Sequence, residues 1–250
     1  MHNFFTALGF LTRIHVKNSK TCTAQEFSAS VVYFPWVGIM IGSFLAIAHK
    51  LCLYLQLPNF LQGVVLIFWE ICLTGTLLLD GFMDTSDGIF SARNRDKMLI
   101  IMKDSHVGAN AVIALVLLIL FKLSFYLAIG EEQLTCALFA MPLVTKVLLV
   151  FFINNFSSAR PDGLGALFQQ SSTIFSNIMA TVLSFGGLIL LGLPYLLAGI
   201  ITFVLGWILA KYIASILGGL TGDTYGFLTE CSGIIFLASL YFLLRVGAGN

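Results

Sequence analysis

The sequence predicts an all-α integral membrane protein, a polytopic helix bundle of about seven transmembrane helices with two further helices at the membrane interface. Hydrophobic residues make up 58% of the 250 residues, and charged residues make up only 10%. Soluble domains usually carry about 25% charged residues, so this composition excludes an ordinary soluble protein. The length, with no linker-like segment, favours one catalytic domain that covers residues 1–250.

The transmembrane helices are predicted from apolar runs of about 20 residues, the length that crosses the hydrocarbon core of a bilayer. Only Gly192, Leu193 and Pro194 stand between the fifth run and the sixth, so that boundary is the least sharply defined. The seven runs cover approximately residues 30–49, 58–80, 109–129, 133–154, 174–192, 194–216 and 231–248.

The N-terminal segment predicts a short helix that lies at the interface rather than across the membrane. It is apolar up to Arg13 and is too short to span. Its large apolar residues are Phe4, Phe5, Leu8, Phe10 and Leu11.

The distribution of lysine and arginine predicts an N-terminus in the cytoplasm, because cytoplasmic loops carry the excess of positive charge. With this orientation only Lys50 and Arg245 approach the outer face, where Glu131 and Glu132 mark a turn. The opposite orientation would place most of the positive charge outside. The basic residues on the inner side are then Arg13, Lys17, Lys20, Arg93, Arg95, Lys97, Lys103, Arg160 and Lys211.

Three polar segments, residues 80–108, 155–173 and 218–230, fall on this same inner side. They concentrate most of the acidic residues on one face of the protein. We therefore expect a single cavity that faces the cytoplasm. The charged residues that define it are Asp80, Asp84, Asp87, Asp104, Arg160, Asp162, Asp223 and Glu230.

The stretch LLLDGFMDTSDG at residues 77–88 places three aspartates directly after an apolar run. Spacings of four and three residues put Asp80, Asp84 and Asp87 on one face of a helix. The three carboxylates repel one another, and each loses hydration near lipid. Positive charge beside them offsets both costs and makes such a stripe stable. Mg²⁺ usually binds through a few carboxylates plus substrate phosphates. The stripe therefore predicts a magnesium or manganese site for phosphate or diphosphate chemistry.

Other interpretations of these acids remain open. The stripe can be a solvated acidic cap on a helix, or part of a proton or cation pathway. Glu70 lies on roughly the same face three turns deeper, where it is either a relay acid or a protonated or internally hydrogen-bonded core residue. His106 is expected to have a hydrogen-bonding role rather than to act as a general base.

The segment after Gly88, IFSARNRDKMLIIMKDSHVG, predicts the second interfacial helix. Ser91 or Asn94 can cap it, and Gly108 can end it. Asp104 near its end can return to the metal site from a second direction. Some of its basic residues are expected to hold phosphates, because arginine offers a bidentate fork. Its apolar side consists of Met98, Leu99, Ile101 and Met102.

Glycine is frequent next to the charged residues, which is typical of backbone that approaches a ligand or another helix closely. Gly81 and Gly88 lie in the aspartate stretch. SSARPDGLGALF and LGGLTGDTYGFLTE, at 157–168 and 217–230, surround Arg160 and Asp223 with glycines. Such backbone at membrane depth is tolerated where it is buried or lines a wet cavity. Neither segment contains the GxxxxGK[ST] pattern of a P-loop.

The ordered series of motifs resembles the cobalamin synthase family, adenosylcobinamide-GDP ribazoletransferase, over nearly the whole chain. Members often carry a histidine where this chain has Leu78, so the resemblance implies no required base at that position. The motifs are FFTALGFLTRIHV at 4–16, YFPWVGIMIG at 33–42, the aspartate segment at 77–108, ARPDGLGALF at 159–168 and GGLTGDTYGFLTE at 218–230.

The resemblance implies a membrane transferase that joins adenosylcobinamide-GDP to α-ribazole or its 5′-phosphate. GMP leaves, adenosylcobalamin or its 5′-phosphate forms, and Mg²⁺ is the expected cofactor. The implied partners are these small molecules and the lipid bilayer, without nucleic acid and with the oligomeric state open. The implied location is the plasma or inner membrane, with the active site on the cytoplasmic side.

The residues agree with a mechanism in which a bound metal ion holds the diphosphate while a ribose hydroxyl attacks the cobinamide-side phosphorus. Asp223 or Glu230 can take the hydroxyl proton or bind a second ion. Beside these two, the predicted catalytic residues include Asp84, Asp87 and Asp104. The predicted metal ligands are Asp80, Asp84, Asp87 and Asp104. The predicted substrate-binding residues are Arg93, Lys103, Arg160, Gly88 and Gly222.

Three rival classes share part of this pattern. DTSDG at 84–88 fits the opening DxxDG of CDP-alcohol phosphotransferases, but the following Ala92 and Arg93 come one residue late, and Gly108 stands where a final aspartate is needed. An aromatic prenyltransferase needs a second aspartate-rich helix, which the sequence lacks. A cation transporter would use Glu70 and the aspartates as ion ligands.

Overall fold

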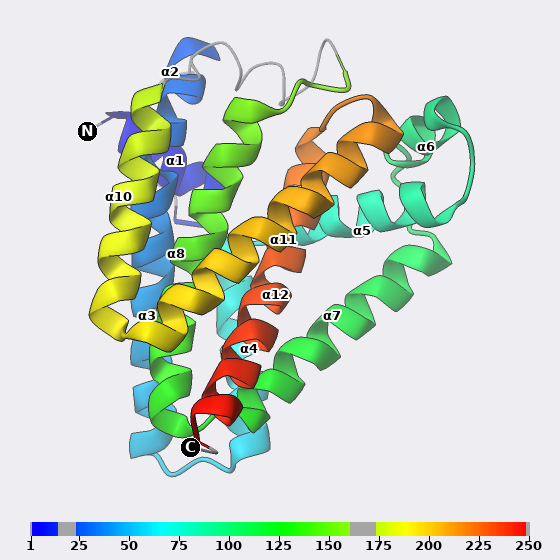
Figure 1. Ribbon diagram of the computed structural model, residues 1–250. Helices are drawn as coiled ribbons and strands as arrows, with labels where there is room; N and C mark the ends of the chain where they lie inside the picture. Colours follow the sequence, from blue (N-terminus) through cyan, green and yellow to red (C-terminus); the bar gives the residue numbers. More distant parts are fainter. Residues whose placement is uncertain (1, 15–23, 161–173, 249–250) are drawn as a thin grey trace.

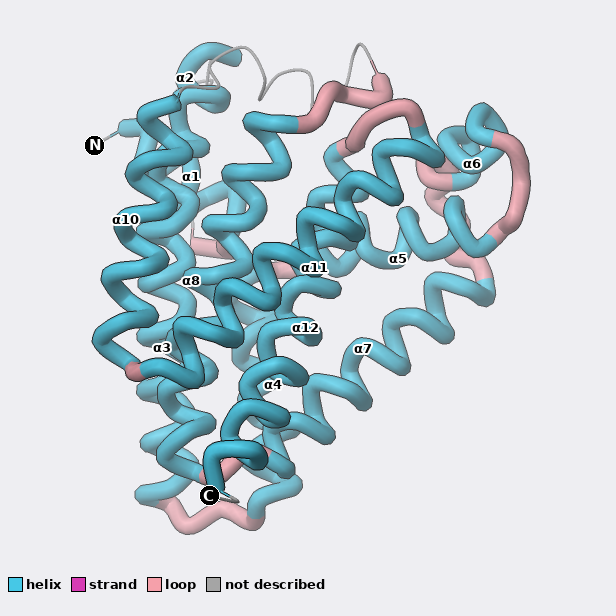
Figure 2. The backbone as a smooth tube through the Cα atoms, in the orientation of Figure 1, coloured by secondary structure: helices cyan, strands magenta, loops and turns pink. Residues whose placement is uncertain are grey.

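A computed structural model describes residues 2–14, 24–160 and 174–248, and this part of the chain is almost entirely helical (Figures 1 and 2). Within these ranges the one extended pairing is an isolated bridge between Ser158 and Leu220. The helices are α1 (His2–Leu11), α2 (Ala24–Ala29), the 3₁₀ helix η1 (Ser30–Tyr33), α3 (Phe34–Tyr54), α4 (Asn59–Thr74), α5 (Leu77–Phe90), α6 (Arg95–Ile101), α7 (Ala109–Ala128), α8 (Glu131–Asn155), α10 (Ile174–Leu191), α11 (Leu193–Leu217) and α12 (Gly222–Ala248).

The predicted polytopic helix bundle is confirmed, although seven spans is an approximate count. Among the described residues, five helical stretches are long and apolar enough to cross, and α4 and α5 pass only as a bent pair, which is either a broken span or a re-entrant loop. The predicted span at 174–192 is the shorter apolar helix α10. The five helical stretches long and apolar enough to cross a membrane are Gln25–Tyr54, Ala109–Ala128, Glu131–Asn155, Leu193–Leu217 and Gly222–Gly247.

The predicted continuous span at 58–80 is wrong, because the chain turns sharply at Gly75. This glycine has φ +72°, a left-handed conformation that ends α4 with little strain. α5 then leaves at an angle of 98° to α4 and runs across the bundle (Figure 1). The N–H of Arg13 donates to the carbonyl of Leu73, 2.8 Å away, which ties the segment after α1 to this corner.

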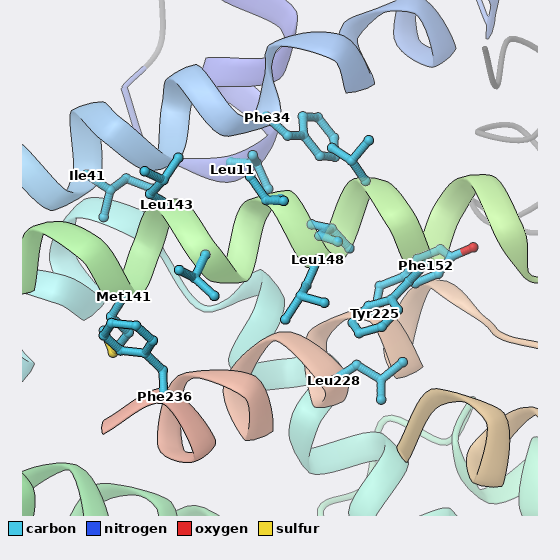
Figure 3. Packing of buried hydrophobic residues seen from close by; sticks show 14 of the residues in the cluster. Leu11, Phe34, Ile41, Met141, Leu143, Leu148, Phe152, Tyr225, Leu228 and Phe236 are labelled. Atoms are coloured by element: carbon cyan, nitrogen blue, oxygen red, sulfur yellow. The ribbon is translucent and has the colours of Figure 1, made fainter. Parts of the chain in front are cut away.

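Helix α8 forms the centre of the bundle. Its sequence is apolar around nearly the whole circumference, which is typical of a helix buried on all sides. It is the most buried of the candidate spans. Figure 3 shows its residues Leu143, Leu148 and Phe152 between Phe34 of α3 and Leu228 of α12. In a membrane these buried side chains stabilise the bundle through van der Waals packing, because lipid tails are as apolar as leucine.

Two helix crossings depend on glycine. A Cβ atom on Gly38 of α3 would lie 3.1 Å from Cα of Leu143 on α8. A Cβ atom on Gly81 of α5 would lie 2.9 Å from Cα of Asp223 on α12. Small residues that let backbones approach this closely are the usual contact between helices in a membrane, where lipid competes with hydrophobic association.

Both predicted short helices are present. α1 packs against α3 and buries Ala7, Leu8 and Leu11. α6 starts at the predicted cap, because the Asn94 side chain accepts a hydrogen bond from the Lys97 N–H at 3.1 Å. The burial of Met98 and Met102 confirms these two residues of its predicted apolar side.

The predicted end of α6 at Gly108 is wrong. The helix already ends at Ile101, and Gly108 is instead the residue that precedes the first turn of α7. Gly88 provides space for α6, because a Cβ atom at Gly88 would lie 3.0 Å from the sulfur of Met102. Its role in substrate binding stays a prediction.

Candidate functional site

The three aspartates of the stripe lie on one helix, α5, as the spacing predicts. The exposure of the three side chains differs. Asp80 is exposed, Asp84 is half-buried and Asp87 is buried. The charged groups that act on the Asp84 carboxyl are those of Asp80, Asp87, Asp223 and Arg160. The acids of α5 and of α12 therefore share one electrostatic environment.

The segment before residue 161 and the segment before α12 lie side by side. The Leu220 N–H donates to the Ser157 carbonyl, and the Ala159 N–H donates to the Leu220 carbonyl, each at 2.8 Å. Gly219, with φ +141°, makes this pairing possible, since a side chain there would clash with the Ser158 backbone. This pairing brings Arg160 next to the start of α12.

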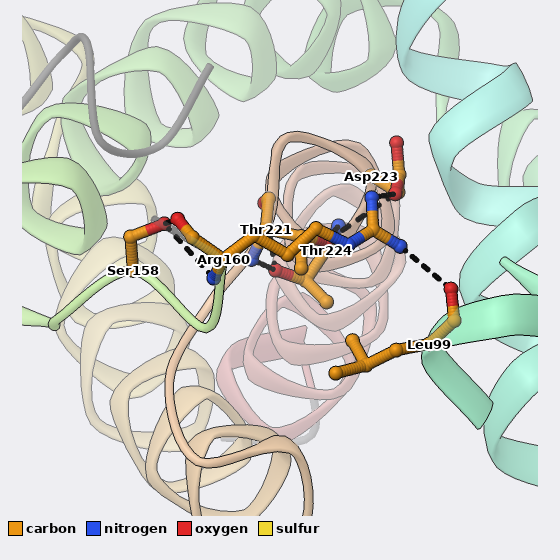
Figure 4. A network of polar contacts seen from close by, with 6 residues as sticks. All are labelled: Leu99, Ser158, Arg160, Thr221, Asp223 and Thr224. Carbon is orange, nitrogen blue, oxygen red and sulfur yellow. Dashed lines mark hydrogen bonds and ion pairs between the residues drawn. The ribbon is translucent and has the colours of Figure 1, made fainter. Parts of the chain in front are cut away.

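Arg160 connects three parts of the site (Figure 4). Its Nη1 contacts Asp223 Oδ2 at 3.2 Å, and its Nη2 donates to the Leu99 carbonyl of α6 at 3.0 Å. Asp223 also accepts a hydrogen bond from the Thr221 hydroxyl at 3.4 Å. An arginine held in this way keeps a fixed direction and can still offer charge-assisted bonds to a phosphate.

Local sequence places Asp223 in the first turn of α12. Thr221 and Thr224 bond reciprocally: the Thr221 N–H donates to Thr224 Oγ1 at 2.8 Å, and the Thr224 N–H donates to Thr221 Oγ1 at 3.2 Å. This is the arrangement by which hydroxyl side chains begin a helix. A carboxylate so near a helix N-terminus is stabilised by the helix dipole.

Arg95, which the sequence placed only among the basic residues of the inner side, makes contacts in this region that were not predicted. Its Nε donates to the Leu217 carbonyl at 2.7 Å, at the end of α11, and its Nη2 donates to the Ala159 carbonyl at 3.4 Å. Arg95 thereby joins α6 to both segments that carry the site. A basic residue next to the C-terminus of a helix interacts favourably with the helix dipole. The sequence could not predict this contact, because Arg95 and Leu217 are 122 positions apart.

Asp80 and Asp223 line a pocket between α5 and α12. Gly81 and Gly222 line it on the same two helices, and its remaining walls are mainly apolar side chains from α1, α3 and α8. Gly222 lines this pocket, and its role in substrate binding stays a prediction. Two larger cavities, at α8, α10 and α11 and at α5, α7, α11 and α12, are lined almost entirely by apolar residues and offer no charged group to a phosphate.

Asp87 anchors helix α7. Its Oδ2 accepts the Gly108 N–H at 2.6 Å, and its Oδ1 accepts the Ala111 N–H at 2.8 Å. These are two of the N–H groups that a helix N-terminus leaves without an intrahelical partner. Gly108 is required here, because a Cβ atom would lie 2.7 Å from Asp87 Oδ2. The role of Asp87 as a metal ligand stays a prediction beside this capping role.

The substitution Asp87→Ala is expected to lower the free energy of unfolding by about 2 kcal/mol, because it leaves two buried N–H groups without acceptors. Asp87→Asn keeps one acceptor and should lose less. Thermal unfolding in detergent and amide exchange at residues 108–111 measure both effects. Equal stability of Asp87→Ala and the parent protein would contradict the capping role.

Asp104 lies in the exposed loop between α6 and α7 and contacts His106. The hydrogen bond from His106 lowers the pKa of the Asp104 carboxyl, and the same bond raises the pKa of His106. The predicted hydrogen-bonding role of His106 fits this pair. The proposed return of Asp104 to the metal site stays a prediction.

Glu230 is not beside Asp223. It lies deeper in α12, where its Oε2 contacts Lys122 Nζ at 2.8 Å. Lys122 Nζ also contacts Glu70 Oε1 at 2.9 Å, so Glu70 is an internally hydrogen-bonded residue, one of the two roles considered for it. Arg93 and Lys103 are exposed on the α6 side, and their contact with substrate stays a prediction. Asp162, Gly163 and Gly165 lie outside the described residues.

The carboxylates of this region fit a magnesium site whose remaining ligands come from the substrate. No group of three or more His, Cys, Asp or Glu side chains in the described ranges is close enough to hold a metal by itself. Mg²⁺ commonly needs only one or two carboxylates when phosphates supply the other oxygens. Asp80, which lines the pocket, and Asp84, whose carboxyl is acted on by the charges of Asp80 and Asp223, meet that requirement.

The fold and the pocket define an integral membrane protein with an acidic, arginine-containing site at one end of a helix bundle. Comparison with known proteins defines it further. The chain belongs to the cobalamin-5-phosphate synthase family, whose model matches residues 3–241.

Relatives named adenosylcobinamide-GDP ribazoletransferase are similar over almost their whole length. The protein from Desulfitobacterium hafniense is 35% identical over 98% of both chains. The one from Desulforamulus reducens is 39% identical over 94% of both chains, and the one from Klebsiella pneumoniae is 37% identical over 95% of this chain and 98% of its own. No solved structure matches this chain.

Proposed function

We propose that this chain is an adenosylcobinamide-GDP ribazoletransferase of cobalamin assembly. The proposal rests on the family match across residues 3–241 and on relatives of that name that align along nearly their full length. The substrates are adenosylcobinamide-GDP and α-ribazole or its 5′-phosphate. The products are GMP and adenosylcobalamin or its 5′-phosphate.

In this reaction an oxygen of the ribazole ribose forms a bond to the phosphorus nearer the cobinamide. The bond from that phosphorus to the bridging oxygen of the diphosphate breaks, and GMP leaves with the electron pair. The proton of the attacking hydroxyl needs an acceptor. Asp223 is the better candidate of the two acids considered, because it lines the pocket whereas Glu230 is paired with Lys122.

Arg160 is the proposed phosphate clamp. Its guanidinium is positioned between Asp223 and the Leu99 carbonyl, with a side chain that is 18% exposed. When a diphosphate enters, the same donors can turn to its oxygens, which releases Asp223 to accept a proton. Arg93 and Lys103 are proposed as further cationic contacts.

We propose Mg²⁺ as the cofactor, with Asp80 and Asp84 as the groups that hold it and Asp87 and Asp104 as further candidates. When bound, the ion supplies charge neutralisation at the phosphates. The chain's own carboxylates orient the diphosphate, and the apolar walls of the pocket reduce access of water.

We also propose that the site faces the cytoplasm from the plasma or inner membrane. The basic residues close to the site, among them Arg93, Arg95 and Lys103, support this orientation through the positive-inside rule. Labelling of single cysteines introduced at exposed positions of α6 by an impermeant reagent, in right-side-out and inverted vesicles, tests it.

An assay of purified protein with adenosylcobinamide-GDP and α-ribazole, with and without Mg²⁺, tests the function. The expected result is GMP release that requires both substrates and the metal. Release of CMP from a CDP-alcohol, release of diphosphate from a prenyl donor, or ion flux in proteoliposomes without GMP release would contradict the proposal in favour of one of the three rival classes.

A further inference from the structure

A buried cluster of charged side chains lies below the acid site. Lys122 Nζ contacts Glu70 Oε1 at 2.9 Å and Glu230 Oε2 at 2.8 Å. The three side chains are only 7%, 13% and 11% exposed. Tyr126 adds a hydrogen bond to Glu70 Oε2 at 3.4 Å. Ionisable groups inside a membrane protein are costly and usually have a function.

Each of the three partners lies on a helix that is connected to the acid site. Glu70 is in α4, which continues around the Gly75 corner into α5 with Asp80 and Asp84. Lys122 is in α7, whose N-terminus is held by Asp87 of α5. Glu230 is in α12, two turns beyond Asp223. The cluster is thus a second place at which these helices contact one another.

A second lysine, Lys146 of α8, is 4% exposed and lines the same small cavity as Lys122, Glu70 and Glu230. Leu78 lines both this cavity and the acid pocket, so one turn of α5 separates the two.

The crossing of α5 and α12 needs a further contact, such as these ion pairs, to fix the position of one helix relative to the other. Gly81 and Gly226 bring the two backbones together, with a Cβ at Gly226 only 3.2 Å from Cα of Leu78. A glycine contact permits close approach, but it has no side chain that interlocks and resists sliding. Ion pairs in a low-dielectric interior depend strongly on distance and direction. They specify an arrangement more than they add net stability.

We propose that Lys122 is a positioning residue that sets the separation between Asp84 on α5 and Asp223 on α12, through its ion pairs to Glu70 and Glu230. This rests on the proposed function, because the acids it positions are those of the transferase site. Glu230 then acts at the site through its helix and does not touch substrate.

The main test is the neutral triple variant Lys122→Met, Glu70→Gln, Glu230→Gln. Replacing all three together removes both ion pairs without leaving a lone glutamate, so the midpoint of thermal unfolding should fall less than in Lys122→Met alone, which leaves two unpaired glutamates. Turnover should nevertheless fall at least about tenfold, because small displacements of catalytic groups cost that much or more. KM should change by less than about twofold. Lys122→Arg, which keeps the charge, should retain more activity than the triple variant.

Amide exchange supplies a readout that does not depend on activity. Exchange at residues 77–81 and 221–226 should accelerate in the triple variant, while α3 remains unchanged. Glu132→Gln, an exposed glutamate at the start of α8, is the matched control and should leave both turnover and exchange as in the parent.

Parental turnover in a folded triple variant, or unchanged exchange at both segments, would overturn the positioning role. If the triple variant does not fold, Glu230→Gln is used, and parental turnover and exchange in it would overturn the proposal equally. Failure of the parent protein to release GMP would refute the proposed function instead, and the exchange comparison would still test the role of the ion pairs.

Discussion

Replacing Asp84 by asparagine is expected to abolish turnover while the protein still accumulates in the membrane. Asp84 is the half-buried acid that shares its surroundings with Asp80, Asp87, Asp223 and Arg160. The amide has nearly the same shape but no charge to hold a cation or to balance the arginine. A loss of roughly 10³-fold in kcat, or about 4 kcal/mol, is the size expected for removing a main electrostatic group.

Asp96→Asn is the matched control for this experiment. Asp96 carries the same change on α6, but its side chain is 84% exposed and lies 3.5 Å from Arg95 at the surface. Its activity should equal that of the parent. GMP release by both proteins, purified to the same monodispersity, is the measurement. Turnover of Asp84→Asn above about a tenth of the parental value would contradict the role of Asp84.

Gly226→Ala is expected to destabilise the protein and to reduce its activity at the same time. Alanine is favoured over glycine inside a helix by about 1 kcal/mol, so a helix considered alone would gain stability. At this position the new methyl group meets the backbone of Leu78, which cannot rotate away as a side chain can. Overpacking of this kind typically costs about 1–3 kcal/mol, and α5 and α12 must separate to relieve it.

Gly247→Ala separates the effect of helix propensity from the effect of overpacking. Gly247 lies in the same helix, but a Cβ atom there would have no neighbour within 4 Å. Its unfolding midpoint should therefore stay the same or rise, whereas that of Gly226→Ala should fall. Thermal unfolding in one detergent and GMP release measure both variants. A midpoint for Gly226→Ala at or above that of Gly247→Ala would show that the crossing tolerates a side chain.

Periodicity and spacing were sufficient for much of the bundle. The offsets of four and three residues placed Asp80, Asp84 and Asp87 on one helix, and Asn94 was one of the two caps, with Ser91, that residue type indicated. The corner at Gly75 was missed because apolar residues continue on both sides of it, so hydropathy read 58–80 as one span. The left-handed conformation of a single glycine leaves no trace in a hydropathy profile.

Pairings between distant segments could not be predicted from the chain alone. Glu230 was predicted as an alternative to Asp223 in the site, yet its partner is Lys122, 108 residues away. Asp87 was grouped with its neighbours on α5, and its bonds to the start of α7 depend on where that helix docks. The reaction itself came from the resemblance of ordered motifs and not from the spacing of charges.

The 98° corner between α4 and α5 has a consequence for the acids that follow it. Along a helix that continued straight, the seven residues from Asp80 to Asp87 would descend about 10 Å, one third of the hydrocarbon thickness. Each acid would then meet a different polarity. With the corner, the same residues advance sideways and change little in position along the α4 axis, so the row of acids extends across the bundle toward the start of α12.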